Sequence, residues 1–387
     1  MTRALPLLLA AALALPARGD DRRELAAPLG LGTDGTIREL FLDMPIADAR
    51  APRAGLEVRW SMANDWSTPT YAASGAKVVL IQTDEQSDSL AFTLRVPWSR
   101  LLGPGPAAGA RPLFERLSTT VDWRLTQHWG GWSDGAIEWW HRFAGFYNFE
   151  RDRYPRNQLH LSLGQVGGRQ TIDLHSAQLS FGDVALRTQY LLAEGGAAVV
   201  PGQTADARRW GLSARLDLKA PVGMLSRMGG SGGFDAGVGL LGSWELSSFL
   251  VGHAMATAQY WSGFAGEQPL QPLGFHWSAE VSLALLLGPV ALVLEDRVVS
   301  AMFDDTGWRR VSPVTPVAAT APRLASSAWF ATFRAQNGIT GGLRWGRFTL
   351  WFAEDWTPGS NPTGVYKWFY DSNAPDVEIG LGYAQPL

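Results

Sequence analysis

Hydrophobic and polar residues alternate along most of the chain from Leu56 onward. In the first such stretch Leu56, Val58 and Trp60 share one face of an extended strand, and Glu57 and Arg59 share the other. Similar alternation recurs over residues 90–98, 159–163, 184–190, 209–219, 234–245 and 275–285. The longer of these stretches, 209–219, 234–245 and 275–285, have 11 or 12 residues. Strands of about 10 to 13 residues suit tilted membrane strands better than the 5 to 6 residues of an average globular strand.

The alternation alone fits two folds, because the apolar face can meet either a soluble core or lipid. The composition favours lipid, since 18 Trp, 17 Phe and 43 Gly in 387 residues are typical of aromatic girdles and tight strand packing. We therefore predict an all-β fold, a transmembrane antiparallel β-barrel of about 14 strands (12 to 16) with one amphipathic helical insert. A soluble exported β-sandwich is the alternative.

The N-terminal region divides into two parts. Arg3, the apolar run that follows it and small residues near Gly19 predict a signal peptide over residues 1–19. Residues 20–54 contain Pro28, Pro45 and Pro52 and no sustained period, so we expect a lead-in at the periplasmic side. Residues 55–387 then form a single barrel domain. The last stretch alternates from Val377 to the end, as the terminal strand of outer-membrane barrels does.

One segment, residues 127–157, departs from the alternation. Ser133 or Asp134 can cap a helix that runs to about Phe146, and Glu138 stands four residues before Arg142, the spacing of a helical ion pair. Aromatic residues gather here, which favours an anchor at the membrane interface. The alternative is a segment that folds against the barrel mouth or into its lumen, where the rings stack on a cargo. The residues in question are Trp129, Trp132, Trp139, Trp140, His141 and Phe143.

The charged face of the predicted strands should line the lumen. Mutual pairing of these charges would stabilise a polar interior, whereas a selective pore would show one sign at its constriction. Glu280, Glu295 and Arg297 fall on two consecutive strands and are expected to form a lining cluster. The predicted lumen-lining residues are Arg59, Arg95, Arg215, Glu245, Glu280, Glu295, Arg297 and Arg344.

Sites for chemistry are scarce in the sequence. Glu138 and His141 have the spacing of a di-metal motif, but the second copy that such sites need is missing, so no metal or cofactor is expected. His160 and Ser162 lie on one strand face, where Asp173 or His175 could join them, and this pattern suggests a membrane-embedded hydrolase as a minor alternative. A polar lumen explains the same residues, so we expect no enzyme activity.

Several stretches together resemble an uncharacterised family of predicted bacterial outer-membrane barrels, classed only as a domain of unknown function. The stretches are LFLDMPIADARAPRAGLEVRWSMAN, SDGAIEWWHRFAGF with RDRYPRN, and GLRWGRFTLWFAEDW with APDVEIGLGY. The resemblance implies an envelope location and a barrel, and it supplies no activity or binding residue.

These observations predict a barrel in the outer membrane of a Gram-negative bacterium that is a channel or binding barrel for small solutes or apolar molecules. The alternative is a structural or interaction barrel with an occluded lumen and no transport. Expected partners are outer-membrane lipid, the barrel assembly machinery and a small-molecule cargo. Nucleic acid is not expected, because the net charge is -3 and no basic stripe occurs.

Overall fold

The structure is a computed structural model of the whole chain. It describes residues 22–32, 37–50, 54–66, 81–101, 111–144, 155–166, 169–196, 209–266, 271–302, 335–355, 357–360, 366–370 and 377–387. The predicted signal peptide, residues 1–19, lies outside the described residues.

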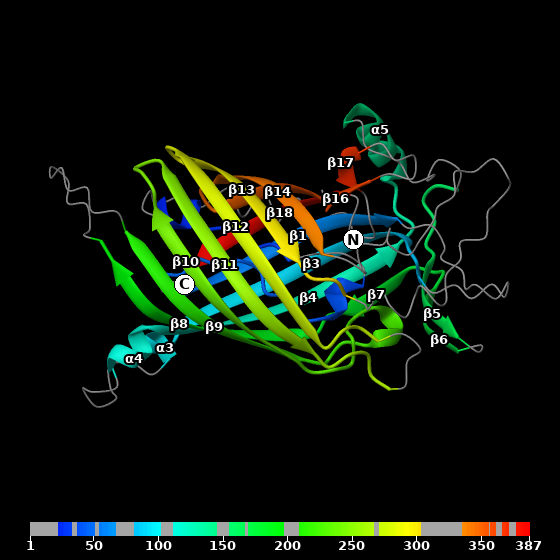
Figure 1. Ribbon diagram of the computed structural model, residues 1–387, viewed down its shortest axis with the longest axis horizontal. Coiled ribbons are helices and arrows are strands. Elements are labelled where there is room, and N and C mark those ends of the chain that lie inside the picture. The colour runs from blue at the N-terminus through cyan, green and yellow to red at the C-terminus, as the bar shows by residue number, and fades with distance from the viewer. Residues whose placement is uncertain are drawn as a thin grey trace.

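Most described strands belong to one 13-stranded antiparallel sheet. One member, β7 (Gln178–Phe181), pairs only with β4, and the other twelve close into a barrel in which β1 pairs with β18 and Gly55 lies opposite Pro386 (Figure 1). The antiparallel barrel is therefore confirmed, with two strands fewer than the central estimate of 14. The twelve strands are β1 (Gly55–Trp66), β3 (Asp84–Pro97), β4 (Leu117–Trp129), β8 (Val184–Gly195), β9 (Trp210–Ala220), β10 (Asp235–Glu245), β11 (Leu250–Trp261), β12 (Phe275–Leu287), β13 (Val290–Val299), β14 (Gln336–Trp345), β15 (Phe348–Asp355) and β18 (Val377–Pro386).

The lower strand number has a clear cause. The alternating stretch at 159–163, expected as a barrel strand, instead begins β5 (Leu161–Val166), which pairs with β2 (Ile81–Gln82) and β6 (Arg169–Leu174) in a separate sheet. Its Leu161 and the β6 residue Leu174 are buried in the protein and do not face lipid. Alternation predicts a two-faced strand correctly, but it does not say which sheet that strand joins. A further pair, β16 (Thr357–Ser360) and β17 (Tyr366–Tyr370), also lies outside the barrel sheet.

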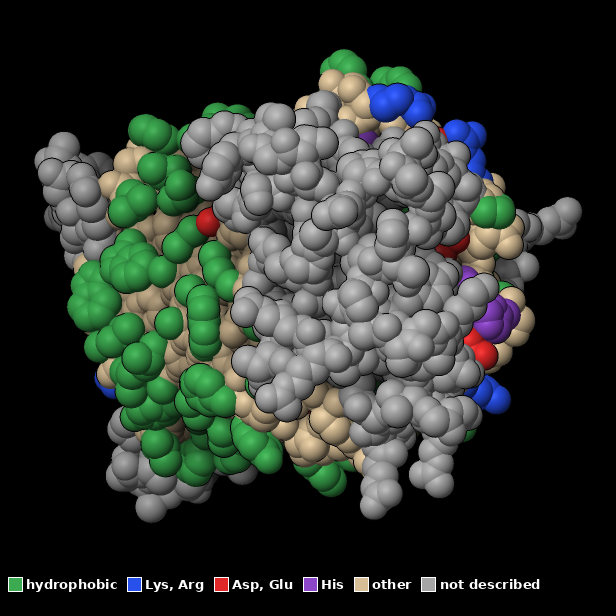
Figure 2. Space-filling model, turned by 45° about the vertical axis from the view of Figure 1, so that its right-hand side comes forward, with side chains coloured by type: hydrophobic (Ala, Val, Ile, Leu, Met, Phe, Trp, Pro, Cys, Tyr) green, Lys and Arg blue, Asp and Glu red, His purple; other side chains and the backbone are tan. Residues whose placement is uncertain are grey.

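The outer wall of the barrel is apolar and the inner wall is polar. On β9, Leu216 and Leu218 are 47% and 46% exposed, whereas Asp217 between them is 0% exposed. Hydrophobic side chains cover the part of the wall that Figure 2 shows free of grey atoms. Exposed aromatic residues lie toward both strand ends: Trp210, Trp244 and Trp345 at one end, and Phe234, Tyr260 and Phe275 at the other. This arrangement is that of a transmembrane barrel of the outer-membrane type.

The two ends of the barrel differ. At the end that we call the turn end, residues 246–249, 288–289 and 346–347 connect neighbouring strands, and β18 finishes the chain. The short helices α3 (Trp98–Leu101) and α4 (Arg111–Glu115) also lie there. At the opposite loop end, residues 130–183, 221–234 and 262–274 connect the strands and contain α5 (Asp134–Ala144), β5, β6 and η3 (Leu225–Arg227). Their partner β2 lies in the connection between β1 and β3 at the same end. No helix among the described residues is both long and apolar enough to cross a membrane.

A charge on the outer wall tests the membrane-spanning arrangement. Leu240 lies in the middle of β10 and is exposed, so Leu240→Arg should lower the unfolding free energy in lipid vesicles by about 2–4 kcal/mol. Val222→Arg is the matched control, because the equally exposed Val222 lies just beyond β9 near the interface, where about 0–1 kcal/mol is expected. Urea unfolding in vesicles measures both, and equal losses would contradict the arrangement.

Candidate functional site: the filled lumen

The lead-in segment lies inside the barrel. Residues 22–32 and 37–50, which we call the plug, contain only the short helices α2 (Arg22–Ala26) and η1 (Arg38–Leu40). The plug begins at the turn end, where Ala26 O accepts a hydrogen bond from His253. It reaches the loop end at Leu42, whose backbone N–H donates a hydrogen bond to Asp235. It then returns to Arg50, which pairs with Glu245 on β10 at 3.1 Å. We expected this segment at the periplasmic side, and the structure shows that it fills the lumen (Figure 1).

Inward-facing charges hold the plug by its backbone. Glu280 accepts a hydrogen bond from Ile46 N at 2.8 Å, Glu295 accepts one from Leu29 N, and Arg215 donates to Pro45 O at 2.7 Å. Such bonds satisfy both the buried charges and the backbone of a segment that has little secondary structure of its own.

The structure places every predicted lumen-lining residue inside the barrel, and seven of the eight contact the plug. Glu280 and Arg297 are opposite each other on β12 and β13, as the expected lining cluster requires. Arg95 differs from the others, since it pairs with Glu57 at 2.6 Å. The seven that contact the plug are Arg59, Arg215, Glu245, Glu280, Glu295, Arg297 and Arg344.

The plug supplies charges of its own, which the sequence analysis missed. Asp43 accepts a hydrogen bond from Arg297 at 3.0 Å, and Asp48 pairs with Arg23 at 3.0 Å. Glu39 lies 3.4 Å from Arg124 on β4. The available signal was a set of acidic residues among apolar ones in a segment without periodicity, next to a barrel with many inward arginines.

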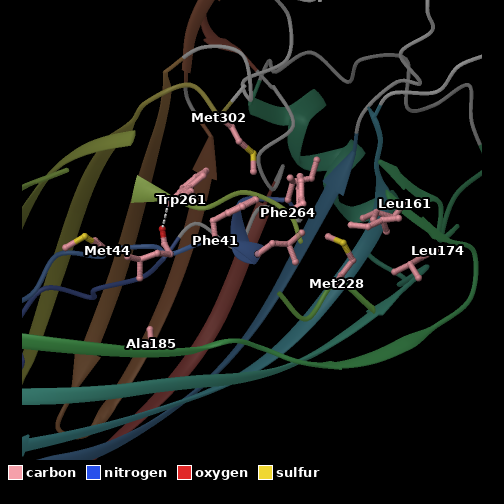
Figure 3. Close-up of a cluster of buried hydrophobic side chains, with 13 residues drawn as sticks. Phe41, Met44, Leu161, Leu174, Ala185, Met228, Trp261, Phe264 and Met302 are labelled. Atoms are coloured by element: carbon pink, nitrogen blue, oxygen red, sulfur yellow. Dashed lines mark hydrogen bonds between the residues drawn. The ribbon is translucent and has the colours of Figure 1, made fainter. Parts of the chain in front are cut away.

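The tip of the plug is apolar. Phe41 stacks on Trp261 of β11 with ring centroids 4.6 Å apart, and Phe264 meets Phe41 edge-on at 5.0 Å (Figure 3). The Trp261 indole N–H donates to Leu42 O at 3.1 Å. Leu161 and Leu174 of the small sheet belong to the same buried cluster, so folded connections at the loop end pack against the plug tip.

Two wall glycines make room for the plug. A Cβ on Gly237 of β10 would lie 2.3 Å from the Met44 sulfur, and one on Gly342 of β14 would lie 2.7 Å from Leu29 Cδ1. A larger residue at either position would require the Met44 or Leu29 side chain to move, so these strand glycines mark a close approach of the wall to the plug.

Within the described residues, two cavities flank the plug. One, of about 130 Å³, lies toward the loop end beside Phe41 and Lys219. The other, of about 180 Å³, lies toward the turn end beside Glu24 and Arg344. Four residues line both cavities and separate them: Pro45, Arg59, Asp122 and Arg187.

Charges of both signs meet at this partition. Arg187 binds Asp122 of β4 and also Asp217 of β9, the latter at 2.8 Å. Arg59 donates to Gly30 O of the plug at 2.9 Å. Because acidic and basic groups are interleaved, neither sign dominates at the partition.

Helix α5 packs on the outside of the barrel at the loop end. Ser133 O accepts the first backbone hydrogen bond of the helix from Ala136 N at 2.9 Å, and the predicted Glu138–Arg142 pair is present at 3.7 Å. The helix comprises Asp134–Ala144 among the described residues, against a predicted end at about Phe146, and residues 145–154 lie outside the described part of the chain. Arg156 binds Glu138 more closely, at 2.9 Å.

The aromatic residues of the insert divide into two groups. Trp140 meets the outward-facing Phe352 of β15 edge-on at 5.4 Å, whereas Trp139 and Phe143 stack on each other at 5.6 Å and are 60% and 72% exposed. Trp132 is also exposed. The other two lie against or within the barrel wall: Trp129 is the last residue of β4 and its indole N–H donates a hydrogen bond to Asp88 at 2.8 Å, and His141 is buried 3.9 Å from Glu354.

The residues of the hydrolase alternative lie in the small sheet. Asp173 and His175 approach His160 from β6 as expected, and His175 lies 2.9 Å from Asp173. Ser162 is only 2% exposed, so a substrate in solution does not reach its hydroxyl. Partial burial and the neighbouring His175 lower the pKa of His160, which keeps its imidazole neutral at neutral pH.

Part of the chain matches a known protein family. Residues 107–266 match the family described as "Protein of unknown function (DUF3187)", which confirms the expected resemblance over a stretch that includes SDGAIEWWHRFAGF. No curated protein matches the sequence.

Solved structures similar to this chain include the COG4313 outer membrane channel from Pseudomonas putida F1, with a TM-score of 0.46, 11% identity and coverage of 87% of this chain and 97% of that one. The NanC porin gives a TM-score of 0.36 and 8% identity, with coverage of 86% of this chain and 99% of that one. A TodX monoaromatic hydrocarbon channel mutant gives a TM-score of 0.35 and 8% identity, with coverage of 94% of this chain and 96% of that one. Since these scores are low, the fold assignment depends on the strand pairings described above.

Loss of the plug tip should destabilise the barrel. Phe41→Ala removes a ring buried against Trp261 and should cost about 3–5 kcal/mol of unfolding free energy. It should also increase trypsin cleavage at plug arginines such as Arg38 and Arg50. Phe234→Ala, the same change at an exposed girdle residue, is the control and should leave the cleavage pattern unchanged. Equal protection of the plug in both variants would contradict the packing role of Phe41.

Proposed function

We propose that the protein is a barrel of a Gram-negative outer membrane, with its turn end in the periplasm and its loop end outside the cell. Three turn-end connections, 246–249, 288–289 and 346–347, have only two to four residues, whereas those named at the loop end have at least 13. This difference supports the orientation, because outer-membrane barrels have short periplasmic turns and longer extracellular loops. The plug also enters and leaves at the turn end, where an exported N-terminus would be found. Assembly by the barrel assembly machinery fits the C-terminal strand β18, which closes the ring with β1.

Within this barrel, we propose a narrow channel for small polar solutes. The observation that carries the proposal is the pair of cavities on the same side of the plug, which share a wall at Arg59, Asp122 and Arg187. Together they follow the lumen between the plug and strands β1, β3, β4 and β8.

The volumes and the lining residues of the cavities indicate which class of solute fits. Volumes of about 130 and 180 Å³ are small beside the roughly 300–1,000 Å³ of pockets for drug-sized ligands. Arginine and carboxylate side chains at the partition suit water, ions and small polar molecules. Of the two classes of cargo expected from the sequence, small solutes therefore fit better than apolar molecules.

The second candidate is an occluded barrel without transport. It is favoured by the partition itself, where Arg187 binds Asp122 and Asp217 and Arg59 binds the plug. If these contacts do not open, the two cavities stay separate and nothing crosses.

Single-channel recording distinguishes the two candidates. Arg59→Ala removes a side chain from the partition, so conductance in planar bilayers should rise above the small value of the unmodified protein. Arg95→Ala is the matched control, because Arg95 lines only the turn-end cavity and should leave the conductance nearly unchanged. Deletion of residues 20–50 should give a much larger conductance.

The outcomes separate clearly, provided that each variant migrates as a folded barrel on an unheated gel. If neither the unmodified protein nor the Arg59→Ala variant conducts ions, the channel proposal is overturned in favour of the occluded barrel. A silent plug deletion would show that the plug is not the barrier.

We further propose that the aromatic insert anchors the loop end at the membrane interface. Trp140 contacts the outward-facing Phe352, and the exposed Trp139 and Phe143 form a stacked pair on the same helix. Aromatic rings at the level of the lipid headgroups stabilise such contacts. A cargo role inside the lumen is less well supported, because α5 binds the outer side of β15.

Single-cysteine labelling tests the anchor, since the chain contains no Cys. A fluorophore on Phe143→Cys should be quenched by brominated lipid, whereas one on Arg142→Cys, the neighbouring residue whose side chain is 60% exposed, should be quenched by aqueous iodide. Quenching of both positions by iodide alone would place the helix away from lipid and reject the anchor.

A further inference from the structure

We propose that His160, Asp173 and His175 form a binding site for a transition-metal cation at the small β2–β5–β6 sheet of the loop end. Zn²⁺ is the preferred ion. One ligand atom from each of the three side chains lies within 4.8 Å of the other two. The rings of His160 and His175 have centroids 4.3 Å apart, and His175 Nε2 lies 2.9 Å from Asp173 Oδ1. This site is separate from the lumen and does not depend on the proposed channel.

The register of the β5–β6 hairpin brings the three side chains together. Ser162 pairs with Asp173 and Leu161 pairs with Leu174, so the next position along places His160 opposite His175. Asp173 precedes His175 by two residues and therefore shares its face of the strand. Directly opposite residues have Cβ atoms about 4.5–5.5 Å apart, a spacing that lets two imidazoles and a carboxylate meet.

The hairpin holds this arrangement firmly. The backbone N–H and C=O of His160 bond the backbone of Asp84, at 2.9 and 3.0 Å. Leu161 and Leu174 alternate with the three polar residues and are buried in the cluster that covers the plug tip. Burial of the apolar face therefore directs the His–Asp face outward, where Asp173 and His175 are exposed and a cation from solution can reach them.

The donor set indicates the class of ion. Two imidazoles and one carboxylate suit first-row transition metals, whereas Ca²⁺ and Mg²⁺ prefer oxygen ligands. Around a tetrahedral Zn²⁺ with bonds of about 2.0–2.1 Å, neighbouring ligand atoms lie about 3.4 Å apart. Side-chain rotations bring the present cluster to that spacing, and water would complete the fourth position. The Asp173–His175 ion pair alone explains two of the residues, but it does not explain why His160 joins them.

Metal titration of the full-length protein in detergent tests the site. After treatment with EDTA and removal of any histidine-containing tag, calorimetry with ZnCl₂ should show one site per chain. Co²⁺ should give the visible absorption of a four-coordinate ion. His160→Ala and His175→Ala should each weaken Zn²⁺ binding by more than about 10-fold, since even the loss of an outer-shell partner costs 10–100-fold.

Two further variants sharpen the result. Asp173→Asn should weaken binding, because an amide is a poorer ligand than a carboxylate, whereas Ser176→Ala, at an exposed neighbour of the cluster, should bind Zn²⁺ normally. Barrel folding of each variant is checked by its migration on an unheated gel. The proposal is overturned if the unmodified protein binds no Zn²⁺, or if a folded double variant lacking both His160 and His175 binds as tightly as the unmodified protein.

Discussion

The burial of charge inside the barrel is the constraint on which the rest of the structure depends. A charged group that leaves water must be paired or hydrogen-bonded, or it destabilises the fold by several kcal/mol. Here the plug provides many of the partners. Leu29 N and Ile46 N donate hydrogen bonds to Glu295 and Glu280. Pro45 O accepts a hydrogen bond from Arg215. The irregular backbone of the plug follows from this, because several of its backbone polar groups bond side chains of the wall.

The same constraint explains why the remaining space lies on one side. Apolar plug residues pack against strands β10 to β13 and β15 through clusters that contain Leu29, Leu31, Ile46 and Ala49. The opposite wall, from β1 through β8, faces the plug mainly with polar and charged side chains. Polar groups need not pack as closely as apolar ones, since water can solvate them, and the two cavities lie there.

The loop end combines three environments within a short distance. The plug tip is buried beneath the small sheet, helix α5 lies against the outer wall at Phe352, and the outer face of the β5–β6 hairpin meets solvent. The β5–β6 hairpin thus has two different faces. Leu161 and Leu174 pack into the apolar cluster, whereas Asp173 and His175 face water. A stable apolar face is what allows the polar face to be held in a fixed geometry.

The sequence by itself determined the wall of this protein. A period of two gave the strand type, the antiparallel barrel and the inward direction of charges such as Glu280 and Arg297, because side-chain direction in a strand is a local property. The capped helix after Ser133 was equally local. Only the tertiary structure decided that residues 22–32 and 37–50 enter the lumen, that the 159–163 stretch leaves the barrel, and that His160 meets His175. Each of these depends on which partner a segment finds across a long stretch of chain, and local patterns of hydrophobicity do not encode that choice.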